Sequence, residues 1–398
     1  MNIGIGIWDL NKISSLTIFE NNVKQGLVGA GNKVEDIFFS QNKEKASNPY
    51  GCDHSYLVNS ENDHDKILNI TKNMDHFLLL FPCPMINKNY KDKTWISLVK
   101  KIAKNTSVHA FAHEPFFERP MSWFREVADS IDNIFALQYS AYDSFHEEFG
   151  DKVKLFLDFP QDFTHAGWDN EKKEESAICP HYFKSWKHVD LIVRAIPNIN
   201  AVTHIYNIGT EYYYLAGSLE KRKERYKNAN GEWIWDVSIN SKKLNYHGVA
   251  KYEEIVARYK TSKILLDAST GPSGTKIQRM DGIIEGQPDL SDFFGIDMPK
   301  KRVYKHINLN VLIEAIMYGA IPIFREKYCH TDFVDNDDAF WVTNEGSDEK
   351  IAKDYADKAN YILENWESFK KRREDNLVKY KQKYDRVNSM KTLVSKYF

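Results

Sequence analysis

The stretch that most constrains the fold is Val311–Phe324, which reads VLIEAIMYGAIPIF. Residues Val311–Tyr318 have the composition of a buried helix. Gly319 predicts the end of that helix, because glycine adopts the left-handed capping conformation at no steric cost. Ala320–Phe324 then reads as a short buried strand. The sequence therefore predicts a helix and a strand that both lie inside a hydrophobic core.

Glu314 is the exception within this apolar helix. A buried carboxylate is costly unless another group binds it. A ligand contact would explain the residue, and so would a helix-capping or salt-bridged glutamate. The stretch alone leaves these alternatives open.

The first part of the chain predicts a parallel sheet. Met1–Trp8 reads as a strand, Leu16–Gly29 as an amphipathic helix and Val34–Phe39 as a second strand, which together form the opening unit of a Rossmann-like domain. His76–Phe81 is apolar without alternation, as expected for a strand covered on both faces. Further strands are expected at Ser107–His113, Ile131–Ser140, Val153–Asp158, Thr203–Ile208 and Ser262–Ala268, and further helices at Trp95–Lys104, Lys187–Ala195, Tyr252–Lys260 and Lys350–Ser368.

The length of 398 residues favours two domains. We expect an N-terminal domain over 1–165, a C-terminal domain over 166–375, and a final helix over 376–398 that returns to the first domain. The polar segment Phe159–Ser176 is the expected linker. The first loop lacks the Gly-x-Gly-x-x-Gly of a dinucleotide site, which disfavours an NAD enzyme.

Composition excludes several classes of protein. A hydrophobic content of 42% suits a globular protein, and the net charge of −2 argues against a basic tail, although a local nucleic-acid groove stays possible. The four cysteines have no metal-ligand spacing, which favours reduced thiols in the cytoplasm. We see no signal peptide and no apolar run of the ~20 residues that a membrane span needs, so we expect no membrane association. We also expect a monomer.

Two groups of residues are candidates for chemistry. His113 and Glu114 follow the strand Ser107–His113, and ligands of open parallel sheets gather beyond the carboxyl ends of strands. A surface histidine next to a strand-ending proline is the alternative. Lys184 and Lys187 stand at the start of a helix, where lysines and backbone N–H groups can bind a diphosphate. Two solvated surface lysines would give the same pattern.

The motif around Glu314, with glycine, proline and an apolar residue after it, resembles the donor-sugar helix of GT-B glycosyltransferases. Several motifs in order resemble the bacteriophage DNA α-glucosyltransferases, which glucosylate hydroxymethylcytosine in duplex DNA. The matching residues are Thr17 and Phe19, Gly31 and Val34, Phe111–Glu114, Trp186–Lys187, and Glu314 with Gly319–Phe324. The chain departs from that family in its first loop, Asp9–Ser15, and in Glu114, where the family has aspartate. His306 stands where many retaining enzymes have a second glutamate.

The resemblance implies a GT-B fold, with two Rossmann-like domains whose parallel sheets face each other across a cleft. It implies transfer of a sugar, with retention, from a UDP-sugar to the hydroxyl of a hydroxymethylated pyrimidine in phage DNA, in the host cytoplasm. No metal or other cofactor is expected. His113 and Glu114 are the expected catalytic residues, and the expected donor contacts are Lys184, Ser185, Lys187, His306, Glu314 and Gly319. The expected DNA contacts are Phe116, Arg119, Arg125, Lys276, Arg279, Lys300, Lys301 and Arg302.

Two other functions stay open. A GT-B glycosyltransferase of the bacterial cell surface or capsule would act on a lipid- or sugar-linked acceptor. A non-catalytic module that binds nucleotide sugars or nucleic acid would release no nucleotide diphosphate from any donor.

Overall fold

The computed structural model describes residues 1–8, 15–40, 52–58, 60–80, 94–112, 125–181, 187–207, 230–269, 309–325, 333–343 and 345–398. These residues form two compact units. Unit 1 holds the described residues of Met1–Asp162 together with Gln382–Phe398, and unit 2 holds those from Phe163 to Lys381. No helix among the described residues is long and apolar enough to span a membrane.

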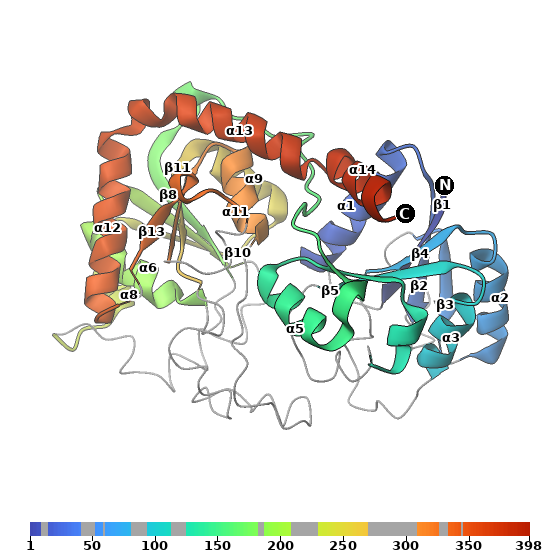
Figure 1. The fold of residues 1–398 in the computed structure, drawn as a ribbon. Helices are drawn as coiled ribbons and strands as arrows, with labels where there is room; N and C mark the ends of the chain where they lie inside the picture. Colours follow the sequence, from blue (N-terminus) through green and yellow to red (C-terminus); the bar gives the residue numbers. More distant parts are fainter. Residues whose placement is uncertain are drawn as a thin grey trace. The chain divides into compact units, whose positions relative to one another are not determined.

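Unit 1 is built on a parallel sheet of seven strands in the order β3-β2-β1-β4-β5-β6-β7 (Figure 1). The strands are β1 Asn2–Trp8, β2 Lys33–Ser40, β3 His54–Leu57, β4 His76–Leu79, β5 Ser107–Ala112, β6 Asn133–Ala136 and β7 Val153–Leu155. The helices are α1 Ser15–Gly29, α2 Glu61–Thr71, α3 Thr94–Ile102 and α5 Tyr139–Phe149. The strand order reverses between β1 and β4, which pair directly.

The last helix of the chain, α14 (Arg386–Tyr397), belongs to unit 1 and packs along α1. Gly26 permits this close approach, because a Cβ there would lie 2.3 Å from the carbonyl oxygen of Arg386. The ring of Phe398 stacks on His76 and His109, with centroids 4.4 Å and 4.5 Å away. The C-terminal segment therefore covers part of the sheet of the first unit.

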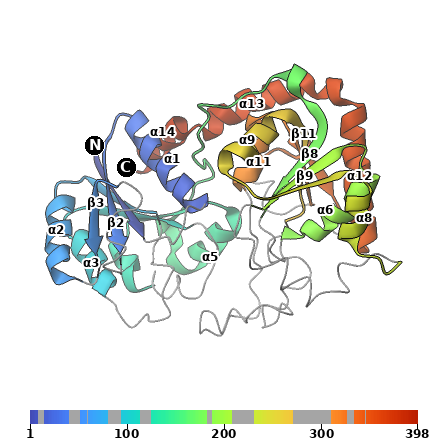
Figure 2. The same ribbon diagram turned by 180° about the vertical axis from the view of Figure 1, so that it is seen from behind.

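Unit 2 contains a second parallel sheet, of six strands in the order β10-β9-β8-β11-β12-β13. The strands are β8 Glu174–Pro180, β9 Val202–Asn207, β10 Leu244–Val249, β11 Ser262–Asp267, β12 Ile321–Arg325 and β13 Phe340–Val342. The helices are α6 Val189–Ala195, α8 Ile234–Asn240, α9 Tyr252–Thr261, α11 Leu309–Met317, α12 Asp348–Glu364 and α13 Lys370–Tyr384, of which the last three residues count with unit 1. Figure 2 shows α6, α8 and α12 on one face of this sheet and α9 and α11 on the other.

Lys173 connects several elements at the amino end of the sheet in unit 2. Lys173, directly before β8, donates hydrogen bonds from Nζ to the carbonyl oxygens of Tyr259, Ser262 and Tyr318 at 2.7–2.9 Å. These bonds connect the ends of α9 and α11 to the sheet. Gly319 ends α11 with a φ of +71°, as the sequence predicted.

The prediction of two Rossmann-like parallel sheets is confirmed. Some local predictions are wrong. The strand expected at Ile131–Ser140 ends at Ala136, and α5 begins at Tyr139. Tertiary packing overrides the strand preference of the aromatic residues in α5. Sequence reasoning also missed β3, α2, β8, α8, β10 and β13. The segment expected as a linker includes the first three residues of β8, Glu174–Ser176.

Candidate functional site

The carboxyl edge of the sheet in unit 2 contains a topological switch point between β8 and β11. The chain leaves β8 through α6 toward β9, and it leaves β11 through α11 toward β12, on the other side. In open parallel sheets, ligands bind beyond the carboxyl ends of strands at such a point. The residues that directly follow these two strands are His181 and the pair Ala268–Ser269. They define the candidate site.

His181 and Asp267 meet at this switch point, and both side chains are buried. The Nε2 atom of His181 lies 3.4 Å from Oδ1 of Asp267, which also accepts a hydrogen bond from the backbone N–H of Ser269 at 2.7 Å. Burial lowers the pKa of His181 to about 4 against the opposing charge of Asp267. The imidazole is therefore neutral near pH 7.

Lys187 brings a positive charge to the same place. It lies two residues before α6, and only 4% of its surface is exposed. Its charge opposes protonation of His181 and favours ionisation of the Cys179 thiol, whose pKa burial raises, so the ammonium group lies within electrostatic reach of both. Lys187 is therefore not a solvated surface lysine. A buried cation at the carboxyl edge of a parallel sheet is suited to binding an anion.

Glu314 is the sixth residue of α11, and 8% of its surface is exposed. Its Oε1 accepts a hydrogen bond from the hydroxyl of Tyr252, at the start of α9, at 2.9 Å. Burial raises the pKa of Glu314 to about 7, and the hydrogen bond from Tyr252 opposes this rise. In the described part of the chain Glu314 neither caps a helix nor forms a salt bridge, so both structural alternatives from the sequence are excluded there.

Two other predicted site residues fall within the described residues. Gly319 precedes β12 at the amino end of the sheet, where a Cβ would lie 2.2 Å from Cδ2 of Trp168, so its contacts are those of a helix terminator. Arg125, in unit 1, is exposed and forms a salt bridge with Glu148. The predicted residues His113, Glu114, Phe116, Arg119, Lys184, Ser185, Lys276, Arg279, Lys300, Lys301, Arg302 and His306 lie outside the described residues.

Sequence reasoning missed His181, Asp267 and Tyr252. Asp267 was visible near the end of the predicted strand Ser262–Ala268, and His181 directly follows β8, a strand that was not predicted. A polar residue at the end of a buried strand was therefore an available signal. The order of the strands, which makes these two residues neighbours, was not available.

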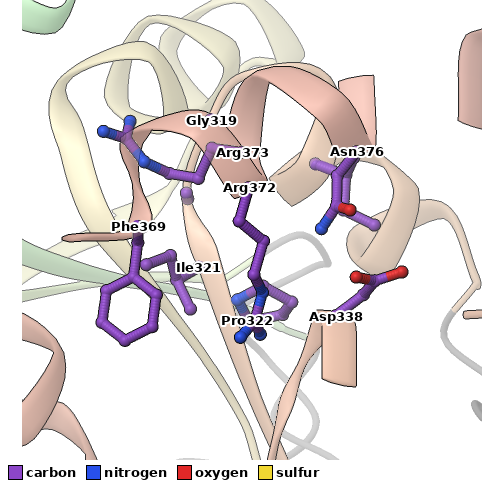
Figure 3. Close-up of a pocket in the computed structure, with 10 residues that line it drawn as sticks. Gly319, Ile321, Pro322, Asp338, Phe369, Arg372, Arg373 and Asn376 are labelled. Atoms are coloured by element: carbon purple, nitrogen blue, oxygen red, sulfur yellow. The ribbon is translucent and has the colours of Figure 1, made fainter. Parts of the chain in front are cut away.

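A shallow pocket lies at the opposite, amino edge of the same sheet (Figure 3). Its volume of about 10 Å³ has room for about one water molecule. Arg373, one of its lining residues, stacks on Trp366 with its guanidinium 3.7 Å from the ring centroid and donates a hydrogen bond to Asn170. These contacts support a structural role for this pocket.

Within the described ranges, no cluster brings together three or more His, Cys, Asp or Glu side chains that could hold a metal ion. The sequence contains Asp-x-Asp triplets at Asp63–Asp65 and Asp335–Asp337. The first aspartate of each forms a salt bridge with a lysine, Lys66 and Lys379 respectively.

No family model and no curated protein matches the sequence. Solved structures match over almost the whole chain. The Anabaena protein HepE, in complex with UDP and glucose, has a TM-score of 0.64 at 8% identity and covers 99% of this chain and 98% of its own. An α-glucosyltransferase in complex with UDP and a 13-mer DNA containing an HMU base has a TM-score of 0.62 at 12% identity, with the same coverage. The lipopolysaccharide outer core galactosyltransferase WaaB has a TM-score of 0.61 at 12% identity and covers 100% of both chains. The two parallel sheets and these likenesses show that the chain has the GT-B fold.

Proposed function

We propose that this GT-B chain is a glycosyltransferase that moves a sugar from a UDP-sugar to a hydroxyl group. The observation that carries the proposal is the buried Lys187 beside His181 and Asp267 at the switch point of unit 2. Proteins of the same fold, HepE and the α-glucosyltransferase, were solved with UDP bound. Their ligands support the choice of nucleotide.

Lys187 has the chemistry that the reaction needs. As the glycosidic bond of the donor breaks, negative charge grows on the departing diphosphate. A fixed cation in a site of low dielectric constant lowers the barrier, because no solvent has to reorganise around the developing charge. We propose that Lys187, with Lys184 and Ser185, serves this purpose without a metal ion.

Glu314, with Tyr252 beside it, is suited to binding a hydroxyl group of the donor through a hydrogen bond. The carboxyl group of Glu314 receives one hydrogen bond from Tyr252 and retains further acceptor capacity. We propose that it binds a hydroxyl of the donor ribose or sugar, and His306 remains a proposed donor contact on the basis of the sequence. His113 and Glu114 remain the proposed catalytic residues, on the basis of the sequence, and retention of configuration remains a proposal from the family resemblance.

For the acceptor we propose a hydroxymethylated pyrimidine in duplex DNA. The order of the sequence motifs supports it, and so does the likeness to an α-glucosyltransferase solved with DNA. An enzyme that modifies a base takes it out of the stack, and phosphate contacts hold the duplex. The proposed contacts are Phe116, Arg119, Arg125, Lys276, Arg279, Lys300, Lys301 and Arg302.

A cell-surface glycan acceptor is the second candidate. WaaB, a lipopolysaccharide outer core galactosyltransferase, matches the chain about as well as the DNA-bound enzyme does, with a TM-score of 0.61 against 0.62. The fold therefore supports both acceptor classes equally.

The donor is tested by incubating the purified chain with UDP-glucose and other UDP-sugars and measuring release of UDP. Lys187→Met should reduce turnover by about 100-fold, the scale of losing one electrostatic contact to the transition state. Lys172→Met is the matched control, since that lysine is exposed in the same unit. If no UDP-sugar releases UDP with any acceptor, the chain is a binding module. If Lys187→Met retains full turnover, Lys187 has no role at the diphosphate.

The acceptor is tested with duplexes that contain hydroxymethylcytosine, hydroxymethyluracil or unmodified bases, using a donor with a labelled sugar. Label should transfer only to the hydroxymethylated duplexes, and DNA binding should weaken as salt rises. Transfer to lipid-linked saccharides, with no label on DNA and no duplex binding at low salt, would establish the cell-surface alternative.

A further inference from the structure

Arg325, the last residue of β12, is a buried cation that has no role in the chemistry proposed above. Only 8% of its surface is exposed, and its Nε lacks a hydrogen-bond partner. Within the described ranges no carboxylate forms a salt bridge with it. A buried guanidinium nitrogen without a hydrogen-bond partner is costly to the fold. Unfavourable groups of this kind are typical of ligand-binding sites.

The strand registers place Arg325 next to the candidate site. Leu265 of β11 pairs with Ile178 of β8, and Asp267 of β11 pairs with Phe324 of β12. Extended to the strand ends, these registers align His181, Ala268 and Arg325 in one row across three neighbouring strands. Adjacent strands lie about 4.8 Å apart, so the three residues of this row are close neighbours in the fold.

The centre of this row is Ala268, a small residue that is fully buried in the hydrophobic core of unit 2. Tyr355 of α12 is buried over the same strand ends, donates a hydrogen bond to the carbonyl oxygen of Asp267 at 2.7 Å, and lies within electrostatic reach of Arg325. The row is therefore shielded from solvent by α12.

Ser269 provides a second, independent observation. Its side chain is fully buried, and its Oγ has no hydrogen-bond partner. It lies two residues beyond the end of β11, the strand that pairs with β12. The hydroxyl of Ser269 and the Nε of Arg325 are both buried and have no hydrogen-bond partner, and both are donors that fit a phosphate oxygen.

We propose that Arg325 and Ser269 bind the phosphate groups of the donor and that Arg325 is a second fixed cation beside Lys187. This assignment rests on the UDP-sugar donor proposed above and adds two residues to its binding site. Arginine suits this position because its guanidinium stays charged at every physiological pH and can bind two phosphate oxygens at once. Two cations also match the charge of a diphosphate better than one.

The test measures binding of uridine, UMP and UDP to the full chain by calorimetry. Arg325→Met should leave the affinity for uridine unchanged and weaken that for UDP by about 10- to 100-fold, the factor of a charge-assisted hydrogen bond. Arg325→Lys should restore part of the UDP affinity. Ser269→Ala should weaken UDP binding by a smaller factor.

The melting temperature separates a binding role from a structural one. Arg325→Met should raise the melting temperature of the ligand-free chain, because it removes a buried charge without a partner. The matched control is Arg194→Met, since the side chain of Arg194 is also buried but forms a salt bridge with Glu349 at 3.0 Å. Its loss should lower the melting temperature and leave UDP binding unchanged.

The outcomes distinguish the two proposals. If the unaltered chain binds UDP and Arg325→Met binds it equally well, Arg325 does not contact phosphate and the inference is wrong, while the proposed donor stands. If the unaltered chain binds neither UMP nor UDP, the proposed donor is wrong and the inference is refuted with it.

Discussion

Replacing Glu314 with glutamine should make the ligand-free protein more stable above neutral pH. The carboxyl group is buried in α11, and burial raises its pKa from 4.5 to about 7. Glutamine has nearly the same shape and can still accept the hydrogen bond from Tyr252. The substitution therefore removes the charge and little else.

The sign and size follow from linkage between ionisation and folding. Because the pKa of Glu314 is higher in the folded chain, stability from this group is fully present below pH 4.5 and is lost as pH rises through about 7. At 1.36 kcal/mol for each pH unit, the rise in pKa corresponds to about 3 kcal/mol. For a unit of this size, that is a change of about 6–12 °C in melting temperature.

The assay is calorimetric unfolding of the ligand-free chain between pH 4.5 and pH 8. Glu314→Gln and the unaltered chain should unfold at the same temperature at pH 4.5, and the variant should be about 3 kcal/mol more stable at pH 8. Glu253→Gln is the control, because Glu253 is exposed on the neighbouring helix α9. Two results would contradict this reasoning: a Glu314→Gln variant that is less stable than the unaltered chain at pH 8, or a difference in stability that is the same at every pH. Either would show that the ionised carboxylate has sufficient hydrogen-bond partners in the folded chain.

Three further predictions concern the packing of unit 2 and the reaction. Gly319→Ala should destabilise the chain by more than about 2 kcal/mol in urea unfolding, because the residue has a positive φ and its Cβ would overlap the ring of Trp168. Gly231→Ala, at a similar positive φ with open space around it, should cost only about 1 kcal/mol, and equal losses would exclude the overlap. Lys173→Met should lower the free energy of unfolding by about 3 kcal/mol, because three carbonyl oxygens lose their donor, whereas Lys172→Met should leave it unchanged. A Lys173→Met variant as stable as the unaltered chain would mean that these carbonyl oxygens have other donors. Sugar transfer should continue in EDTA, and a complete loss that manganese restores would contradict the proposed metal-free reaction.

Local features of the sequence determined the elements of this protein. The pattern from Val311 to Phe324 predicts a helix, its glycine terminator and a buried strand, and α11, Gly319 and β12 confirm it. Unbroken apolar runs such as His76–Phe81 predicted strands of a parallel sheet covered on both faces, and β4 lies inside such a sheet. Periodicity and turn chemistry act over a few residues, so the sequence displays them directly.

The sequence also identified Glu314 and Lys187 as unusual. A carboxylate in an apolar helix is an anomaly that the sequence displays by itself, and in the fold this carboxylate is buried with a raised pKa. For Lys187 the pattern allowed both a buried cation and a solvated one, and its burial became visible only in the fold. Burial depends on what packs against a residue, and short sequence patterns do not contain that information.

Only the tertiary structure decided which strand ends are neighbours. His181 and Asp267 are far apart in sequence. They meet because β8 pairs with β9 on one side and with β11 on the other, although β11 comes much later in the chain. Arg325 joins them through the register of β12 on β11. Strand order and register result from non-local packing of helices and sheet, so many arrangements are compatible with the same local patterns. The strands β11 and β12 and the helix α11 could therefore be predicted from the sequence, but β8 and the grouping of His181, Asp267 and Arg325 could not.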